Sequence, residues 1–318
     1  MHAQSTTLPL GDRIAGWLPD RVDGRIRVFA WLNFVGNVLI IATGGAVRLT
    51  GSGLGCPTWP LCTPGSLVPT PALVDEGFHS LIEFGNRLMS PILGILALVL
   101  LVLVWPLRTH RRDLFAITWV VMAGIIAQAV VGGITVWTGL NPFIVGFHYV
   151  ASLVLVCVTA VFLVRMAAAP GPRVLAVPRW YAITTHVATL VLAVTVVFGV
   201  LTTGAGPHSG DTLVGRNGFD ATLLEHIHAW PGYILFALTL VLVAVAWARR
   251  LPVRIWVTVL LVAELIQIGV GLYQARNGLP EILVGIHMVL AALTAATMTV
   301  VVMRLKQPVA VGARTDGS

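Results

Sequence analysis

The chain has 318 residues, of which 57% are hydrophobic and only 10% are charged, a balance that excludes a soluble globular domain of this length. Its formal net charge is +7, yet the basic residues flank apolar runs and do not form one face. This distribution excludes a nucleic-acid-binding role and leaves a membrane-embedded protein.

Eight apolar runs follow one another along the chain, each long enough to cross a hydrocarbon core of roughly 30 Å. The predicted spans are residues 29–50, 80–105, 114–138, 143–167, 180–203, 222–247, 253–276 and 281–304. The polar N-terminal segment lacks the apolar stretch of a signal peptide. The sequence therefore predicts an all-α membrane protein whose eight transmembrane helices form two tandem four-helix bundles.

The basic residues predict the orientation of these spans. Most of the 20 Lys and Arg residues lie in the N-terminal segment, in every second loop and in the C-terminal segment. These segments should be cytoplasmic, in a bacterial plasma membrane. The predicted order is a polar, weakly ordered cytoplasmic tail (1–26), a first half (27–168), a cytoplasmic linker (169–177), a second half (178–305) and a second such tail (306–318).

One pattern of polar residues occurs twice. Gln128 precedes His148 by the same interval that separates Gln267 from His287, and both stretches contain a Gly-Leu pair. The further matches are Glu83-x-x-Asn86 with Glu225-x-x-His228, and Thr50-Gly51-Ser52-Gly53 with Thr203-Gly204-Ala205-Gly206. A chain that repeats its few polar intramembrane residues is predicted to contain a duplicated site.

Three histidines, His148, His228 and His287, lie at similar depth near the starts of the fourth, sixth and eighth spans. Ionisable residues inside spans are costly and are functional candidates by default. A single histidine could simply donate to a backbone carbonyl, but matched positions in two halves favour ligands. Imidazoles on facing helices of a bundle are typical axial ligands of haem iron, whereas a closed zinc site needs three or four N or S ligands. Haem is the predicted ligand.

Two glutamates and four arginines accompany the histidines. Glu83 and Glu225 each lie one helical turn before Asn86 and His228, on the same helix face. Such a carboxylate could orient an imidazole, move protons or stabilise a cation, or it could pair with an arginine or be exposed. Glu225 and the arginines at the outward ends of spans are candidate haem-binding residues. Guanidinium groups suit haem propionates, although topology alone also places arginines there. These arginines are Arg48, Arg87, Arg216 and Arg276.

Cys56 and Cys62 lie in the first outward loop, on the oxidising side of a bacterial plasma membrane. Two prolines among the intervening residues allow a tight disulfide-bonded loop, and the spacing is not that of a metal site. The pair could be a structural disulfide or a reducible one near a redox site. Cys157 lies mid-span and is expected to pack in the core.

Residues 44–62, GGAVRLTGSGLGCPTWPLC, resemble the signature that follows the first helix of haem A synthases. The eight spans, the tandem halves and the order of the glutamate and histidine motifs are also similar to that family. The resemblance covers about residues 28–305.

This resemblance implies an oxidoreductase that oxidises one methyl group of haem O to a formyl group, making haem A for terminal oxidases. It implies a haem b between His228 and His287 as electron relay. It also implies a substrate haem on His148 with Glu83 as the catalytic residue, both haem sites toward the outer face, and a disulfide between the loop cysteines. The expected partners are haem O, a haem O synthase (protohaem farnesyltransferase) and an electron donor such as a quinol; a homo-oligomer is left open.

Asn86 departs from the family pattern, which commonly has histidine at this place. An amide is a poor iron ligand, so a substrate haem would be held by His148 alone. We hypothesise that oxygen binds at the open face, with Glu83 and Asn86 as proton and hydrogen-bond partners. One alternative is that this lineage tolerates asparagine and positions the haem otherwise, and another is that the first half has lost its activity.

Two other classes of protein stay open. A di-haem electron carrier or quinol oxidoreductase would need only the duplicated histidines, although Asn86 argues against two symmetric sites. A transporter built on a repeat would hold no haem, and it would need more polar residues near mid-membrane than these spans are expected to contain.

Overall fold

The computed structural model describes residues 18–75, 77–208, 210–211 and 214–309. Within these residues, eight helices are long and apolar enough to cross a membrane, which confirms the predicted all-α membrane protein. The long helices are α2 (Gly24–Leu49), α4 (His79–Val104, continued by the 3₁₀ helix η1, Trp105–Thr109), α5 (Arg112–Trp137), α6 (Pro142–Met166), α7 (Arg179–Ala205), α8 (Ala221–Ala248), α9 (Arg254–Arg276) and α10 (Glu281–Arg304).

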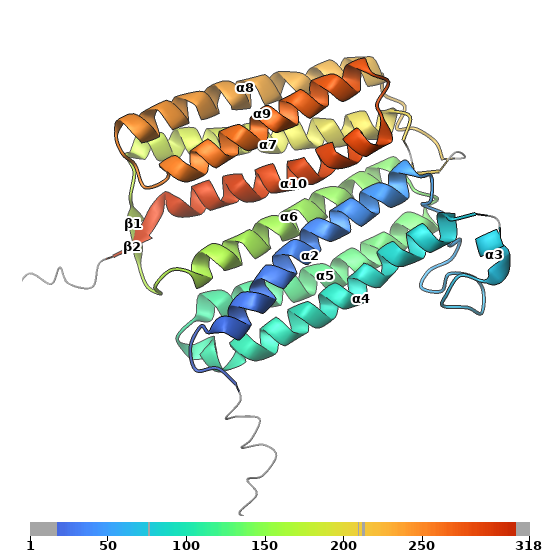
Figure 1. Ribbon diagram of the computed structural model, residues 1–318, viewed down its shortest axis with the longest axis horizontal. Coiled ribbons are helices and arrows are strands. Elements are labelled where there is room, and N and C mark those ends of the chain that lie inside the picture. Colours follow the sequence, from blue (N-terminus) through green and yellow to red (C-terminus); the bar gives the residue numbers. More distant parts are fainter. Residues whose placement is uncertain (1–17, 76, 209, 212–213, 310–318) are drawn as a thin grey trace, which may run out of the picture.

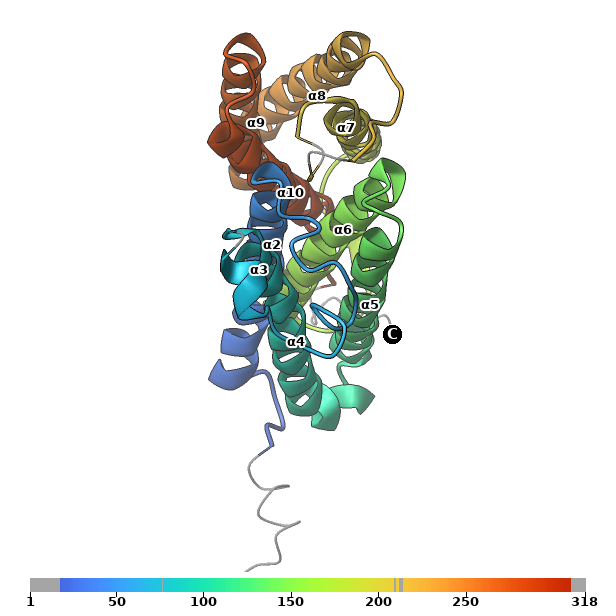
Figure 2. The same ribbon diagram turned by 90° about the vertical axis from the view of Figure 1, so that its right-hand side faces the viewer.

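The helices form two neighbouring groups (Figures 1 and 2). Helices α2, α4, α5 and α6 pack on one another, and α7, α8, α9 and α10 do the same. Helix α10 joins the groups by packing against both α2 and α6. The core between the groups contains Ile41, Val156 and Ala292, so apolar side chains from both halves fill this contact.

Local sequence explains where individual helices begin. Helix α2 starts earlier than its predicted span because Asp23 caps it: the carboxylate oxygen Oδ1 accepts hydrogen bonds from the backbone N–H groups of Arg25 (3.0 Å) and Ile26 (3.1 Å). Asn141 caps α6 in the same way, through the N–H of Phe143 (3.0 Å), and Pro142 occupies the first helical position.

The same turn precedes α6 and α10. Gly139 (φ 59°) and Leu140 (φ 58°) are both left-handed, as are Gly278 (φ 72°) and Leu279 (φ 56°). Each leucine N–H closes the preceding helix by donating to a carbonyl one turn back, at 2.8 Å and 2.9 Å. Leucine rarely adopts this conformation, so its recurrence shows that the repeat extends to the backbone.

One predicted match between the halves is wrong. Thr50 lies just beyond the end of α2, whereas Thr203 still belongs to α7. The two sequences look alike but do not occupy equivalent places, because α7 continues past the point where α2 stops.

The two ends of the helix bundle differ. At one end, here called the loop end, lie the long connections of residues 50–78, which include the short helix α3 (Pro71–Asp75), and 206–220. At the other, here called the terminal end, β1 (Arg173–Leu175) pairs antiparallel with β2 (Lys306–Pro308). The sequence predicted no strands, and the expectation of a weakly ordered tail is wrong for residues 306–308. Residues 1–17 and 310–318 of the predicted tails lie outside the described residues.

Candidate functional site

A cavity of about 650 Å³ is lined by helices of both halves. Its walls contain seven of the residues singled out from the sequence: Arg48, Glu83, Asn86, Arg87, His148, His228 and His287. His148 and His287 are each the seventh residue of their helix, and Asn86 and His228 are each the eighth. All four therefore lie about 10 Å into the bundle from the loop end, at one depth.

In the second half, two imidazoles face each other. The ring centroids of His228 and His287 are 6.2 Å apart, with the ring planes at 78°. Nδ1 of His228 lies 2.9 Å from the carbonyl oxygen of Thr195. A carbonyl oxygen can only accept, so Nδ1 carries the proton and Nε2 keeps a free lone pair.

Glycines make room for these rings. A Cβ atom at Gly199 would lie 2.8 Å from Cε1 of His228, and one at Gly271 would lie 3.1 Å from Cε1 of His287. The imidazoles thus pack directly against the backbones of α7 and α9, and larger residues there would displace them.

The first half contains the counterpart of one of these two histidines, His148, in similar surroundings. Gln128 donates through Nε2 to the carbonyl oxygen of His148 (2.8 Å), as Gln267 does to that of His287 (3.1 Å). A Cβ at Gly132 would lie 3.5 Å from Cε1 of His148. The repeated Gln–His pair is therefore a structural feature: the glutamine fixes the helix that carries the histidine.

Asn86 stands where the second half has His228. The hydroxyl of Thr43 donates to Oδ1 of Asn86 (2.7 Å), and this residue is held against α2 as His228 is held against α7. At this depth the helices of the first half consequently present one imidazole to the cavity, and those of the second half present two.

The residues present fit a haem. A metal–imidazole bond is about 2 Å long, and the bonding nitrogen lies about 1 Å from the centre of its ring. One iron bound between two imidazoles therefore separates their ring centroids by about the 6.2 Å found for His228 and His287. An N–H donated to a backbone carbonyl, as from His228, is the usual way to orient a metal-binding imidazole. Nδ1 of His148 is buried and has no hydrogen-bond partner among the described residues. Among the residues that the structure describes, no three His, Cys, Asp or Glu side chains cluster as a metal site.

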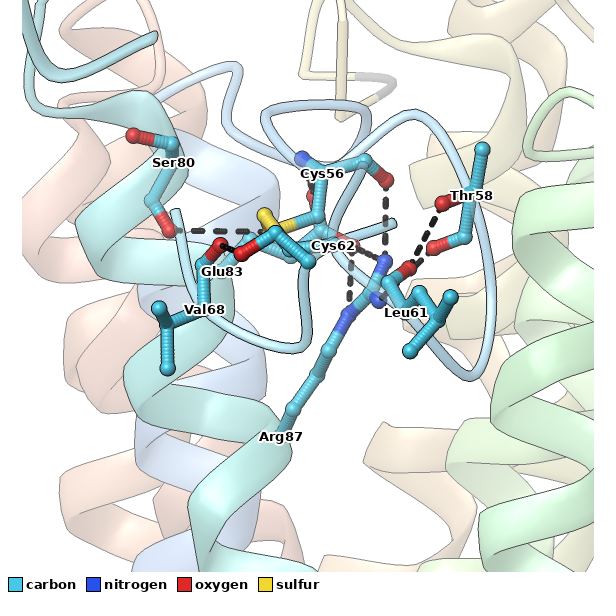
Figure 3. The surroundings of a disulfide bond; sticks show 9 residues. Cys56, Thr58, Leu61, Cys62, Val68, Ser80, Glu83 and Arg87 are labelled. Carbon is cyan, nitrogen blue, oxygen red and sulfur yellow. Dashed lines mark hydrogen bonds and ion pairs between the residues drawn. A yellow bond between two sulfur atoms is a disulfide. The ribbon is translucent and has the colours of Figure 1, made fainter. Parts of the chain in front are cut away.

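Glu83 lies close to Cys56 in the loop that precedes α4 (Figure 3), and it lines the cavity. The residue is 5% exposed. Oε2 accepts the backbone N–H of Cys56 (2.6 Å), and Oε1 accepts Nε of Arg87 (3.1 Å). Cys56 and Cys62 form a disulfide, as predicted. The carboxylate is thus part of the cavity wall and is also bound to the disulfide-closed loop.

The four predicted propionate-binding arginines occupy different environments. Arg48 lines the cavity and donates from Nε to the carbonyl of His208 (2.6 Å) and from Nη2 to that of Thr203 (2.8 Å), so it joins the halves at the loop end. Arg216 and Arg276 are exposed and lie outside the cavity wall, as does Glu225. These three residues are not brought to the cavity. Arg87 also lines the cavity but is hydrogen-bonded to the loop.

Sequence reasoning missed a buried carboxylate near the middle of α9. Glu264 is 4% exposed, lines the cavity and accepts the hydroxyl of Thr239 at Oε1 (2.9 Å). Asn33 and Asn37 are also buried, in α2. The expectation that the spans lack polar residues near mid-membrane is therefore wrong. The signal was available, because any carboxylate inside a span is a functional candidate.

A polar contact also connects α6 and α10, two of the three helices that carry the candidate histidines. The hydroxyl of Tyr149, next to His148, donates to the carbonyl oxygen of Met288, next to His287 (2.9 Å). No feature of the sequence predicted this contact between the halves.

Eight spanning helices around a cavity lined by four histidines, three of them on the helices and His208 in a loop, define an all-α, multi-pass membrane protein with a histidine-lined internal site. The chain belongs to the COX15-CtaA family, described as cytochrome oxidase assembly protein, which it matches over residues 27–208. This match covers the first half and α7, and it ends before the helices that carry His228 and His287.

Curated relatives carry the name "Heme A synthase". The protein of Lysinibacillus sphaericus is 37% identical over 130 residues, which are 41% of this chain and 41% of the relative. The protein of Halalkalibacterium halodurans is 29% identical over 160 residues, or 49% of this chain and 52% of the relative. The chain thus spans about half the length, or less, of these relatives.

Proposed function

We propose that this protein is a haem A synthase, an oxidoreductase that converts a methyl group of haem O to the formyl group of haem A. Membership of the COX15-CtaA family and the names of the relatives support this proposal. The observation that carries it is one cavity in which His148, Asn86 and Glu83 of the first half adjoin His228 and His287 of the second.

The second half is the proposed site of a resident haem b. When bound, this group would supply single electrons to the reaction. His228 and His287 would hold it, and Thr195 keeps the His228 ring in the tautomer whose Nε2 is free. The glycines at 199 and 271 let the rings pack closely against neighbouring helices.

The first half is the proposed site of the substrate. His148 would bind haem O from one side, and Gln128 keeps its helix in place. On the other side Asn86 offers an amide, and Glu83 offers a carboxylate that can hold or pass a proton at Oε1 or Oε2. Arg48, at the same end of the cavity, is the arginine best placed for a propionate, because it lines the wall and, unlike Arg87, is not bound to Glu83 and its loop.

The proposed setting is the bacterial plasma membrane, with both termini cytoplasmic and the cavity toward the outer face. The concentration of basic residues at the terminal end supports this orientation. A haem O synthase is the proposed source of the substrate, and a quinol or another membrane donor is the proposed source of electrons.

Extraction of the haems from the purified protein tests the function. The protein is expressed with and without a haem O synthase, and the haems are separated by chromatography beside a redox difference spectrum. We expect haem b in both preparations, and haem O or A only with the synthase. Haem b alone in both would point to an electron carrier, and no haem in either would point to a transporter.

A further inference from the structure

We propose that Arg87 is a positioning residue for Glu83, and that it acts by clamping the disulfide loop (residues 56–62) onto the first half of the cavity. This proposal rests on the proposed function, because it assigns Glu83 to the reaction. It replaces the expectation that Arg87 binds a haem propionate.

The guanidinium of Arg87 has no donor left for a propionate. A guanidinium carries five N–H groups, one on Nε and two on each terminal nitrogen. Nε donates to Oε1 of Glu83 (3.1 Å), and Nη1 donates to the carbonyls of Thr58 (2.7 Å) and Leu61 (3.2 Å). Nη2 donates to the carbonyl of Cys56 (2.9 Å) and to Oε1 of Glu83. Five hydrogen bonds to four acceptor oxygens, with Glu83 Oε1 accepting two of them, therefore use all five donors.

Glu83 and Cys56 complete a closed unit with Arg87 (Figure 3). The N–H of Cys56 donates to Oε2 of Glu83 (2.6 Å), while its carbonyl accepts from Arg87. The carboxylate is therefore held at both oxygens, once by the arginine and once by the loop. Charge-assisted hydrogen bonds of this kind fix orientation more strongly than neutral ones.

The disulfide gives the loop the shape that this unit needs. It closes residues 56–62 so that three carbonyl oxygens point to one guanidinium. The loop also docks on α5, where the Trp59 ring lies over Gly133: a Cβ there would be 2.5 Å from the ring. Trp59 and Pro60 line the cavity, so the loop is a wall of the site and Arg87 holds that wall to the carboxylate.

Helix α4 and the loop approach too closely to tolerate a side chain between them. A Cβ at Gly55 would lie 2.5 Å from the backbone of His79 and 2.7 Å from that of Ser80. This contact places Cys56 directly over the first turns of α4, within reach of Glu83.

The second half has no such clamp. Arg87 is the ninth residue of α4, and the ninth residue of α8 is Ala229. Glu225, the counterpart of Glu83, is exposed, and the chain has no cysteine in that half. The half that would only hold a haem lacks the clamp, and the half that would carry out the oxidation has it.

A double-mutant cycle tests the proposal. Arg87→Ala, Glu83→Gln and the double variant are compared for haem A formed per protein and for affinity for haem O. We expect Arg87→Ala to lower turnover about 10- to 100-fold, since a misplaced catalytic group costs about that much. Affinity should change less than about twofold, and adding Arg87→Ala to Glu83→Gln should cause no further loss. Arg87→Lys keeps the charge but supplies only three donors, and it should recover part of the activity.

A propionate contact predicts the opposite result. Arg87→Ala would then weaken haem O binding, and its effect would add to that of Glu83→Gln. Either finding would overturn the proposal while leaving haem A synthesis by the wild type intact. If Arg87→Ala does not accumulate, Arg87→Lys carries the same comparison.

A second measurement does not depend on activity. The rate at which a membrane-impermeant phosphine reduces Cys56–Cys62 is followed by thiol labelling and mass spectrometry. We expect at least about fivefold faster reduction in Arg87→Ala, because the loop loses three hydrogen bonds to α4. We expect no change in Arg112→Ala, an exposed arginine at the terminal end. Unchanged reduction in Arg87→Ala would contradict the clamp even if the wild type made no haem A.

Discussion

The two halves of this protein share a scaffold and differ in the groups that face the cavity. In both, a glutamine donates to the carbonyl of the histidine on the next helix, and a left-handed Gly-Leu turn sets where that helix begins. The first half, however, has Asn86 and a clamped Glu83, whereas the second half has His228 and an exposed Glu225. Duplication thus preserved the positions, while the side chains at those positions diverged.

The second half differs further at mid-membrane. Glu264 and Thr239 are hydrogen-bonded there, and the equivalent places of the first half are Ile125 and Ala97, both buried and apolar. The halves therefore differ at two depths, and each half has polar groups that the other lacks. Polar groups that could act on a substrate gather at the loop end of the first half, and a buried carboxylate lies deep in the second.

The largest expected effect comes from removing one of the two facing imidazoles. His287→Ala should abolish haem b binding, because a single remaining imidazole, His228, cannot hold the iron from both sides. The measurement is the haem content and redox difference spectrum of the purified variant. His226→Ala is the control: His226 is exposed, bonds only to its own helix, and should leave the spectrum unchanged. Wild-type haem b in His287→Ala would contradict the assignment.

Making the first half resemble the second should cost activity. Asn86→His supplies a second imidazole opposite His148 and closes the face that the substrate haem is expected to leave open. We expect a second low-spin haem spectrum and turnover reduced about tenfold or more. Electron paramagnetic resonance and haem A yield measure the two effects. Full activity in this variant would mean that an open face is not required.

Glycine substitutions should separate haem-site packing from general helix stability. Gly199→Ala places a Cβ 2.8 Å from the His228 ring, so the variant should lose about 1–3 kcal/mol of unfolding free energy and show a shifted haem spectrum. Gly269→Ala is the matched control, because nothing lies within 4 Å of its Cβ. The control should gain about 0.5–1 kcal/mol. Equal stability of the two variants in detergent melts would argue against ring packing on α7.

The smallest expected effect concerns the buried carboxylate. Thr239→Ala alone leaves Glu264 without its donor and should destabilise the protein by about 1–3 kcal/mol. Adding Glu264→Ile, which reproduces the residues of the first half, should bring the loss back to within about 1 kcal/mol. Thermal unfolding of the single and the double variant measures these two losses of stability. A double variant that loses haem b would show that Glu264 serves the haem site as well as the packing.

The sequence predicted the spans, the repeat and the cavity-facing histidines, since each leaves a periodic or duplicated signal. It could not predict which arginines line the cavity, because an arginine at a span end gives the same sequence pattern whether it faces a cavity or lipid headgroups. Only the structure shows that the donors of Arg87 are all used by Glu83 and by loop carbonyls, and that Arg276 is exposed. The contact of Tyr149 with Met288 was equally hidden, because it depends on how two halves pack and not on either half alone.

We propose that one cavity holds two unlike haem environments, and electron paramagnetic resonance of the oxidised, haem O-loaded protein is the decisive measurement. We expect one low-spin signal that disappears in His287→Ala and one high-spin signal that disappears in His148→Ala. Two low-spin signals of equal weight, or a spectrum unchanged by His148→Ala, would contradict this proposal.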